Sequence, residues 1–400
     1  MNNRLNEIER FAIHNVDKYK DLANLKLEHN IFPILTKKEV QSEPNALLSD
    51  KYRNVLYQTL LSMSTSGSSG MPLEIFWDIK DYHRSMLDLW RLRKSWYGIT
   101  PNMKCLSFSV YNGSLSGDEK YVLFEKNKML VNRKVFGNYD RFSKVLDLIE
   151  SYNPDWLYIQ PLLLNMLIDN LEKSGFNPLK NIKYIETVGE VRTEALQKKA
   201  RNFFNVPIVN LYGSEEMNGI AYECPYHNLH VISSNVYVEC YNDKGILSHG
   251  VGRAIITNLH NYAMPLIRYD QGDIIELSDN QQCKCGCYGK IIENVFGRTN
   301  SILNIDGVDH TPYEFNEIIY KVNGVFDNII TNYRFEIKKS TSHIYIYVGL
   351  KKNHGGWKNE VFKSIEELLH KNISPEADVY IEEWEDEQFI KYKNSSVLIV

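Results

Sequence analysis

Apolar residues between positions 104 and 209 form short runs that alternate with stretches of helical spacing. Runs of four to eight apolar residues are typical of buried strands, and apolar residues three or four apart indicate amphipathic helices. The predicted strands are 104–110, 156–159, 184–188 and 206–211, and the predicted helices are 142–151, 161–174 and 193–204. Because strands that alternate with helices build parallel sheets, this half of the chain predicts an α/β fold.

The pattern on either side of this region is different. Residues 1–60 are charged and helical, with a break at Phe32-Pro33; a strand at 73–77 and a helix at 81–96 follow. After residue 210 the predicted elements are mostly strands (231–241, 252–259, 332–338, 343–350 and 377–384), with one amphipathic helix at 357–371. We therefore expect a large N-terminal domain, 1–297, with parallel sheets and a β-rich subdomain, and a small α+β C-terminal domain, 298–400.

Composition excludes some classes of function. The 400 residues are 43% hydrophobic and 24% charged, and the net charge of −4 offers no attraction for nucleic acid or anionic membranes. No apolar run is long enough to be a membrane span, and the start has no signal-peptide pattern, so we expect a cytoplasmic protein. The oligomeric state stays open, with a homodimer as one alternative.

A loop ahead of the strand at 73–77 combines hydroxyl side chains with glycines. It comprises Thr65, Ser66, Gly67, Ser68, Ser69 and Gly70, followed by Met71-Pro72. Glycines let backbone N–H groups approach a ligand closely, and such groups together with hydroxyls can hold phosphate oxygens. The spacing is not that of a Walker A loop, and the alternative is a surface linker.

Four later segments carry polar residues where a nucleotide site of an α/β sheet would use them. Gly189-Glu190 and Tyr212-Gly213-Ser214-Glu215-Glu216 follow predicted strands, where ligands collect. Arg268-Tyr269-Asp270-Gln271-Gly272-Asp273 ends in a carboxylate that can accept two ribose hydroxyls, and Gly297-Arg298 lies at the predicted domain boundary. Each segment alone has a plain alternative, a turn or a surface ion pair.

In this order, the segments resemble motifs of the adenylate-forming (acyl-activating) enzyme superfamily, most closely its phenylacetate–CoA ligase-like branch, which includes CapK-type proteins. Phe32-Pro33-Ile34-Leu35-Thr36-Lys37 is also similar to a segment of that branch. The resemblance covers nearly the whole chain. It implies an ATP-dependent ligase that adenylates a carboxylic acid and then transfers the acyl group, usually to coenzyme A, with release of AMP.

The resemblance also implies roles for single residues. The loop 65–70 would hold the phosphates of ATP, Glu216 would bind Mg²⁺, Tyr212 would pack on the adenine, and Asp273 and Arg298 would bind the ribose. Gly189, Glu190, Gly213 and Ser214 would line the same cleft. The hinge at Gly297-Arg298 would let the small domain move between the two half-reactions.

The C-terminal lysine of the family departs from its usual setting. The family places it in a Ser-Gly-Lys turn, whereas here the tail reads Gln388-Phe389-Ile390-Lys391-Tyr392-Lys393 without a glycine. Lys391 is the candidate, and Lys393 stays an alternative. If both are surface lysines, adenylation would be slow or would use another cation.

A cysteine cluster predicts a structural zinc site, which the resemblance also implies for some members of the branch. Tetrahedral zinc takes four Cys or His ligands. Cys283 and Cys285 form a pair, and Cys224 with His230 would complete the set. His227 and Cys287 stay alternative fourth ligands, and free buried thiols are the alternative to zinc.

The acid pocket is expected at the ends of the predicted strands. Its candidate residues are Phe108, Tyr111, Tyr158, Gln160 and Thr187. Because no Arg or Lys occupies these positions, a small monocarboxylic acid is expected, and the resemblance implies an aromatic one. The rival hypotheses are adenylation with transfer to an amine or another nucleophile, and a non-catalytic nucleotide- or acyl-binding member.

Overall fold

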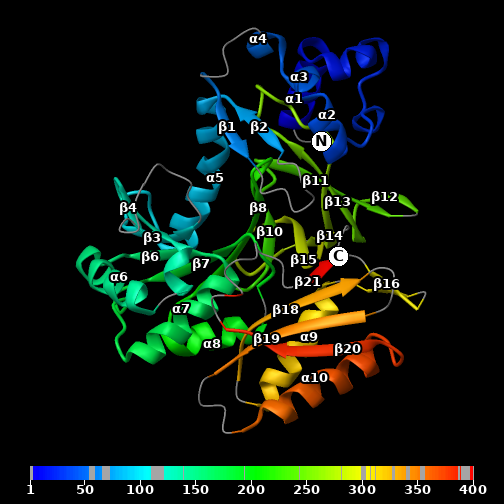
Figure 1. The fold of residues 1–400 in the computed structure, drawn as a ribbon. Coiled ribbons are helices and arrows are strands. Elements are labelled where there is room, and N and C mark those ends of the chain that lie inside the picture. The colour runs from blue at the N-terminus through cyan, green and yellow to red at the C-terminus, as the bar shows by residue number, and fades with distance from the viewer. Residues whose placement is uncertain are drawn as a thin grey trace. The chain divides into compact units, whose positions relative to one another are not determined.

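The computed structural model describes residues 3–53, 59–64, 73–109, 121–137, 139–192, 194–242, 244–280, 282–298, 303–306, 308–310, 312–326, 329–338, 343–351, 356–385, 388 and 397–399. By its internal contacts the chain forms two compact units, each built from two stretches of sequence. Unit 1 comprises Met1–Thr100 and Leu211–Val295, and unit 2 comprises Pro101–Asn210 and Phe296–Val400. Figure 1 shows the elements of both. The predicted domain boundary at 297/298 stays a prediction.

Unit 1 begins with short helices and continues as an antiparallel sheet. Its helices are α1 (Asn3–Asn15), η1 (Asp17–Asn24), η2 (His29–Ile31), α2 (Lys37–Ser42), α3 (Pro44–Leu47), α4 (Asp50–Arg53) and α5 (Ile79–Tyr97). Its strands are β1 (Leu61–Ser64), β2 (Glu74–Trp77), β9 (Asn218–Glu223), β10 (Leu229–Val231), β11 (Val236–Asn242), β12 (Gly245–Leu247), β13 (Gly250–Asn258), β14 (Tyr269–Asn280) and β15 (Gly289–Arg298), and β8 (Ile208–Ser214) enters it from unit 2. The sheet order is β12-β11-β13-β14-β15-β10-β9-β8, and β1 pairs only with β2.

The prediction of one continuous strand at 231–241 is wrong. The apolar stretch 231–241 is divided into β10 and β11 by a turn at residues 233–235. The Asn235 side chain donates to the carbonyl oxygens of Met217 and Gly219, at 3.1 and 2.6 Å. A buried amide that satisfies backbone acceptors stabilises a turn that apolar periodicity does not reveal.

The first half of unit 2 is the α/β layer expected from the sequence. Its strands are β3 (Cys105–Ser109), β4 (Val122–Glu125), β5 (Lys128–Asn132), β6 (Trp156–Ile159) and β7 (Tyr184–Val188), and its helices are η4 (Arg133–Gly137), α6 (Tyr139–Tyr152), α7 (Pro161–Ser174) and α8 (Glu194–Phe204). The strands follow the order β7-β6-β3-β5-β4, and β3, β5, β6 and β7 are parallel. Pro161 at the first position of α7 and Gly175 at φ 65° after it mark the ends of that helix, as the residue types predict.

The second half of unit 2 is a small α+β layer, drawn in yellow to red in Figure 1. Its elements are β16 (Leu303–Ile305), β17 (Val308–His310), α9 (Pro312–Val325), β18 (Ile330–Lys338), β19 (His343–Leu350), α10 (Lys358–Asn372), β20 (Asp378–Glu383) and β21 (Val397–Ile399). A core that includes Phe315, Phe335 and Ile365 joins α9 and α10 to the β20-β19-β18-β21 sheet. No helix in the described part of the chain is both long and apolar enough to cross a membrane.

Candidate functional site

Two of the sequence motifs meet side chain to side chain in unit 1. Tyr212, Ser214 and Glu216 lie at the end of β8 and in the turn that follows it. Tyr269, Gln271 and Asp273 lie at the start of β14. The Tyr212 hydroxyl donates to Asp273 Oδ2 at 2.7 Å, Ser214 Oγ donates to Gln271 Oε1 at 3.3 Å, and the Tyr269 hydroxyl donates to Glu216 Oε1 at 3.2 Å. We call these three hydrogen bonds the motif ladder.

The ladder residues of β14 lie in an irregular part of that strand. The pairing of β13 with β14 shifts where residues 270–274 face Arg253–Ile255, and Gly272 has φ 77°, while Tyr269, Gln271 and Asp273 are all buried. In the sheet order, β15, β10 and β9 separate β14 from β8, so these bonds are not those of neighbouring strands. They are tertiary contacts that fix the positions of two motifs, distant in the sequence, relative to each other.

The turn that carries Glu216 is also fixed by its backbone. Asn258 Nδ2 donates to the carbonyl oxygen of Glu216 at 2.9 Å, and the Trp77 indole donates to that of Glu215 at 3.3 Å. At Gly213 the strands approach so closely that a Cβ atom would lie 2.4 Å from the carbonyl oxygen of Asn218. Only glycine fits there, which gives Gly213 of this motif a structural reason.

The two motifs carry three carboxylates of interest. Glu215, which is exposed, is adjacent to Glu216 in the sequence, and Glu216 and Asp273 each accept a hydrogen bond of the ladder. Glu216 and Asp273 are 5% and 6% exposed, so their charges are held largely away from water. Desolvation, and then the neighbouring Glu216 carboxylate, raise the pKa of Glu215. Buried carboxylates of like charge favour a cation or hydrogen-bond donors as partners, which is the chemistry of a Mg²⁺ and ribose site.

Another candidate carboxylate, that of Glu190, lies in unit 2 shortly after β7. Gly189 adopts φ 81°, and Glu190 Oε2 accepts a hydrogen bond from the Leu162 backbone N–H at 3.1 Å. Within the described ranges, Glu190 Oε1 is buried and no hydrogen-bond partner reaches it. Burial raises the pKa of Glu190 to about 7, against the lowering effects of the Leu162 N–H and the Arg133 charge.

The predicted acid-pocket residues lie on both faces of the unit 2 sheet. Phe108 is buried against Phe136, with ring centroids 5.0 Å apart, and Thr187 is fully buried with its hydroxyl donating to the Val209 carbonyl oxygen at 3.2 Å. Tyr158 and Gln160 are only partly buried. Strand register places Tyr158 beside Ser107 of β3 and Glu186 of β7.

The predicted zinc ligands come together in unit 1. One ligand atom each of Cys224, His230, Cys283 and Cys285 lies within 4.8 Å of the others. Cys224 Sγ lies 3.9 Å from Cys283 Sγ, and Cys285 Sγ lies 3.3 Å from His230 Nε2. Of the alternatives, His227 contacts Glu223 with its side chain 56% exposed. Cys287 is outside the group of four, although its thiol contacts that of Cys285.

These distances fit tetrahedral zinc. With Zn–S of about 2.3 Å and Zn–N of about 2.0 Å, two sulfurs lie about 3.8 Å apart and a sulfur and a nitrogen about 3.6 Å apart. The Asn228 side chain and the Cys285 N–H point at Cys283 Sγ, at 3.2 and 3.5 Å. Burial opposes ionisation, but these donors and neighbouring thiols lower the pKa of Cys283 overall. Donors of this kind support a thiolate ligand.

Comparison with known proteins decides the family. A model of the family described as AMP-binding enzyme matches residues 31–239, more than half of the chain. The chain belongs to the AMP-binding enzyme family.

Individual relatives agree with this assignment. The chain is 26% identical over 200 residues to a phenylacetate–coenzyme A ligase of Thermus thermophilus, a match over 48% of the chain and 44% of the relative. It is 23% identical over 282 residues to protein CapK of Staphylococcus aureus, a match over 68% of the chain and 60% of the relative. The matches therefore span less than two thirds of these curated relatives.

The fold agrees as well. A crystal structure of 2-hydroxyisobutyryl-CoA ligase in the postadenylation state superposes with a TM-score of 0.79 and 15% identity, over 99% of this chain and 88% of that one. The superposition confirms the predicted adenylate-forming α/β fold. The resemblance of the sequence to the phenylacetate–CoA ligase-like and CapK-type branch is confirmed too.

Several predicted site residues of this AMP-binding enzyme are not described. Thr65, Ser66, Gly67, Ser68, Ser69, Gly70, Tyr111, Lys391 and Lys393 lie outside the described residues. Arg298 is the last residue of β15 and is exposed, after Gly297 at φ 109°. Sequence reasoning missed the ladder partners Tyr269 and Gln271 as site residues. Their positions, two and four residues before Asp273, were the available signal.

The raised pKa of Glu190 predicts a dependence of stability on pH. A carboxyl group whose folded pKa is about 7, against about 4.5 unfolded, stabilises the fold below pH 4.5 and loses that contribution as pH rises through 7. Glu190→Gln mimics the protonated group, so we expect it to be more stable than the wild type at pH 8, by about 2 kcal/mol, and equally stable near pH 4. Thermal unfolding of both proteins at the two pH values checks this. A difference in Tm between the two proteins that is the same at pH 4 and pH 8 would contradict this prediction.

Proposed function

We propose that this protein is an ATP-dependent acid–CoA ligase that activates a small monocarboxylic acid. The single observation that carries the proposal is the motif ladder, which joins Glu216 to Tyr269 and Tyr212 to Asp273. Two of the sequence motifs are thereby held together by hydrogen bonds, and membership of the AMP-binding family supports ATP as the substrate. The names of the relatives support an acyl-CoA product.

In the first half-reaction, a carboxylate oxygen of the acid attacks the α-phosphorus of ATP. The P–O bond to the β-phosphate breaks, and pyrophosphate leaves. Mg²⁺, when bound, neutralises phosphate charge. Glu216 would hold it, Asp273 would accept the ribose hydroxyls, and the Tyr212 ring would pack on the adenine. Positioning and charge neutralisation supply most of the acceleration of such a displacement.

Residues outside the ladder would complete the site. The hydroxyls and N–H groups of residues 65–70 would hold the β- and γ-phosphates, Lys391 would bridge the carboxylate and the α-phosphate, and Arg298 would bind the ribose. Gly189, Glu190 and Gly213 would line the nucleotide side, together with Ser214 of the ladder. Of the acid-pocket residues that the structure describes, Tyr158 and Gln160 are the partly exposed ones, and an aromatic acid would suit the Tyr158 ring.

In the second half-reaction, the thiol sulfur of coenzyme A attacks the acyl carbonyl of the adenylate. The bond from the acyl carbon to the AMP oxygen breaks, the thiol proton goes to solvent, and AMP leaves. We propose that the C-terminal domain turns about Gly297-Arg298 between the half-reactions. The φ of 109° at Gly297 supports this, because a glycine tolerates the torsions of a hinge.

We also propose a structural Zn²⁺ held by Cys224, His230, Cys283 and Cys285. It would tie the loop 224–230 to the loop 283–285 and contribute to folding rather than to the reaction. The Cys224–Cys283 and Cys285–His230 distances, 3.9 and 3.3 Å, are close to those between ligands of a tetrahedral zinc and support this site.

Acid-dependent exchange of labelled pyrophosphate into ATP tests the proposed function. A panel with phenylacetate and 2-hydroxyisobutyrate as its first members identifies the acid, and mass analysis with coenzyme A or an amine present identifies the acceptor. Lys391→Ala is expected to lower exchange about 100-fold, and Lys393→Ala to leave it within threefold. Bound ATP without exchange for any acid would contradict the proposal and favour a non-catalytic member. An amide product would favour the amine alternative.

A further inference from the structure

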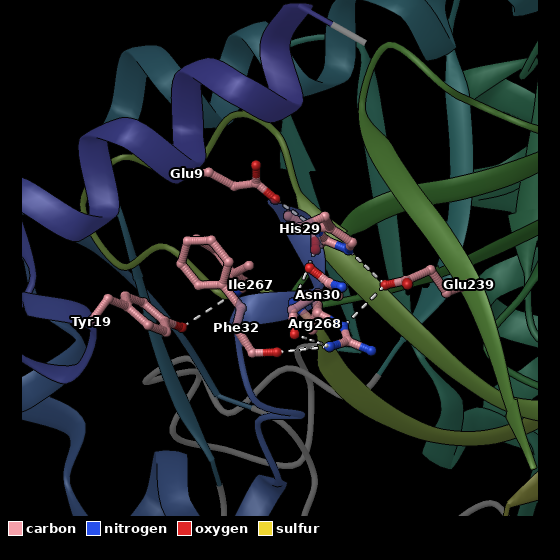
Figure 2. Close-up of polar contacts among 9 residues, drawn as sticks. Glu9, Tyr19, His29, Asn30, Phe32, Glu239, Ile267 and Arg268 are labelled. Atoms are coloured by element: carbon pink, nitrogen blue, oxygen red, sulfur yellow. Dashed lines mark hydrogen bonds and ion pairs between the residues drawn. The ribbon is translucent and has the colours of Figure 1, made fainter. Parts of the chain in front are cut away.

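A cluster of charged side chains that are not members of the ladder is buried in unit 1 (Figure 2). Glu9 of α1 is fully buried, and His29, Glu239 and Arg268 are 7%, 7% and 6% exposed. His29 Nδ1 contacts Glu9 Oε1, and His29 Nε2 lies 2.7 Å from Glu239 Oε2. Arg268 Nε lies 3.4 Å from the same Glu239 oxygen. We call these four residues the buried charge cluster.

The cluster is balanced when His29 is protonated, with two positive and two negative groups. Burial opposes protonation, but the hydrogen bonds that His29 donates to Glu239 and Glu9 outweigh it and raise the pKa of His29. The Tyr237 ring packs edge-on against His29, with centroids 4.9 Å apart. Loss of one member would leave a buried charge uncompensated, which is strongly unfavourable.

Arg268 reaches further than the ion pair. Its Nη1 donates to the Phe32 carbonyl oxygen at 2.7 Å and to the Asn30 carbonyl oxygen at 3.5 Å. Figure 2 shows this guanidinium lying between the Phe32 and Asn30 carbonyl oxygens and Glu239. The planar guanidinium of arginine has five N–H donors and can reach three acceptors that lie in different directions. The single ammonium of a lysine cannot reach all three in the same geometry.

The backbone at Arg268 ties the same segment to β14. Arg268 adopts φ 51°, in the left-handed region, and its N–H donates to Thr257 Oγ1 at 2.9 Å. The Leu35 N–H donates to the Arg268 carbonyl oxygen, and the Asp270 N–H donates to the Leu35 carbonyl oxygen, both at 2.9 Å.

The residues just before Arg268 are held by the N-terminal segment as well. The Tyr19 hydroxyl contacts the Pro265 carbonyl oxygen and the Ile267 N–H, at 3.2 and 3.4 Å. The N-terminal segment thus holds β14 where the ladder begins.

We propose that Arg268 is a positioning residue for the nucleotide site. Its side chain binds the segment 30–32 while the next residue, Tyr269, donates to Glu216, so the torsions at Arg268 set which residues of β14 face the ladder. A loosened Arg268 would let Tyr269 and Asp273 leave their register with Glu216 and Tyr212. This inference rests on the proposed function, because it assigns Asp273 and Glu216 to ATP.

Arg268→Lys and Arg268→Met test the proposal on the full-length protein without any acid. We expect amide hydrogen exchange over residues 269–273 to become at least tenfold faster, and the Kd for Mg·ATP measured by calorimetry to rise at least tenfold. Arg253→Met is the matched control. It removes another arginine that pairs with β14, through Asp270, but does not reach the N-terminal segment. Both of its values should stay within threefold of the wild type.

A double variant separates positioning from stability. Glu239→Gln with Arg268→Met removes one negative and one positive charge, so we expect the Tm to recover most of what Arg268→Met loses. The Kd for Mg·ATP should stay at least tenfold raised, because the Phe32 and Asn30 carbonyl oxygens still have no guanidinium. Recovery of both values would overturn the proposal, since the arginine would then act through stability alone.

The outcomes separate this inference from the proposed function. The positioning role would be overturned if, in both single variants, the amide hydrogen exchange rates over residues 269–273 and the Kd for Mg·ATP stay within threefold of the wild type. A wild-type protein that binds no Mg·ATP would overturn the proposed function instead. In that case unchanged exchange over 269–273 in Arg268→Lys would overturn the positioning role as well, and faster exchange would support it for this segment.

Discussion

Glu216→Gln is expected to lower acid-dependent pyrophosphate exchange by about 100-fold to 1,000-fold while the protein stays folded. The Tyr269 hydroxyl donates to Glu216 Oε1, and a glutamine oxygen can accept the same hydrogen bond, so the ladder should persist. What the variant loses is a negative charge that is 5% exposed at the proposed Mg²⁺ position. A neutral amide is a much weaker ligand for a hard cation than a carboxylate.

Exchange rates across a Mg²⁺ titration measure this effect. Excess Mg²⁺ should recover part of the lost rate, because weaker metal binding is the cause. Glu215→Gln is the matched control: it is the adjacent carboxylate, with a pKa raised by desolvation, and it has no place in the ladder. We expect its exchange rate to stay within tenfold of the wild type. Equal losses in the two variants would contradict the assignment of Mg²⁺ to Glu216.

Cys283→Ser is expected to lower the Tm by about 10 °C, through loss of the proposed zinc site. Structural zinc binds only the folded arrangement of its ligands, so its binding free energy adds to the free energy of unfolding. A loss of about 4 kcal/mol in a unit of this size corresponds to such a shift. Cys283 is 4% exposed and lies 3.9 Å from Cys224 Sγ, so its removal also opens the link between the two loops.

Metal analysis of the purified protein, together with thermal unfolding, checks this prediction. We expect about one zinc per chain in the wild type and less than about 0.2 in Cys283→Ser. Cys287→Ser is the matched control, because Cys287 lies in the same loop but outside the group of four ligand atoms. A strong chelator should lower the Tm of the wild type and of Cys287→Ser, but not that of Cys283→Ser. Less than about 0.5 zinc per chain in untreated wild type would contradict the site.

The positions of several helices and strands in this chain follow closely from the residue types along it. The helix predicted at 161–174 is α7 with the same bounds, because a proline can begin a helix and a glycine in the left-handed region can end one. The strands predicted at 156–159 and 184–188 are β6 and β7, since aromatic and β-branched residues, which favour strands, dominate both segments. The four residues proposed as zinc ligands were also identified from the sequence, because few residue types bind zinc.

The contacts that join distant parts of the chain could not be read in this way. The sequence identifies Tyr212, Glu216 and Asp273 as residues of separate motifs, but the ladder joins β8 to β14 although three strands lie between them in the sheet order. His29 and Glu239 are 210 positions apart, and a buried ion pair of that kind leaves no periodic pattern. Arg268 alone resembled half of a surface ion pair, yet it is buried at the start of β14.

The sequence by itself therefore determined the elements, the family motifs and the chemical types of the ligands, because these depend on local conformational preference and on the residues themselves. Only the tertiary structure decided which polar side chains face one another. That choice depends on strand order and register, which are set by packing over the whole unit and not by any short segment.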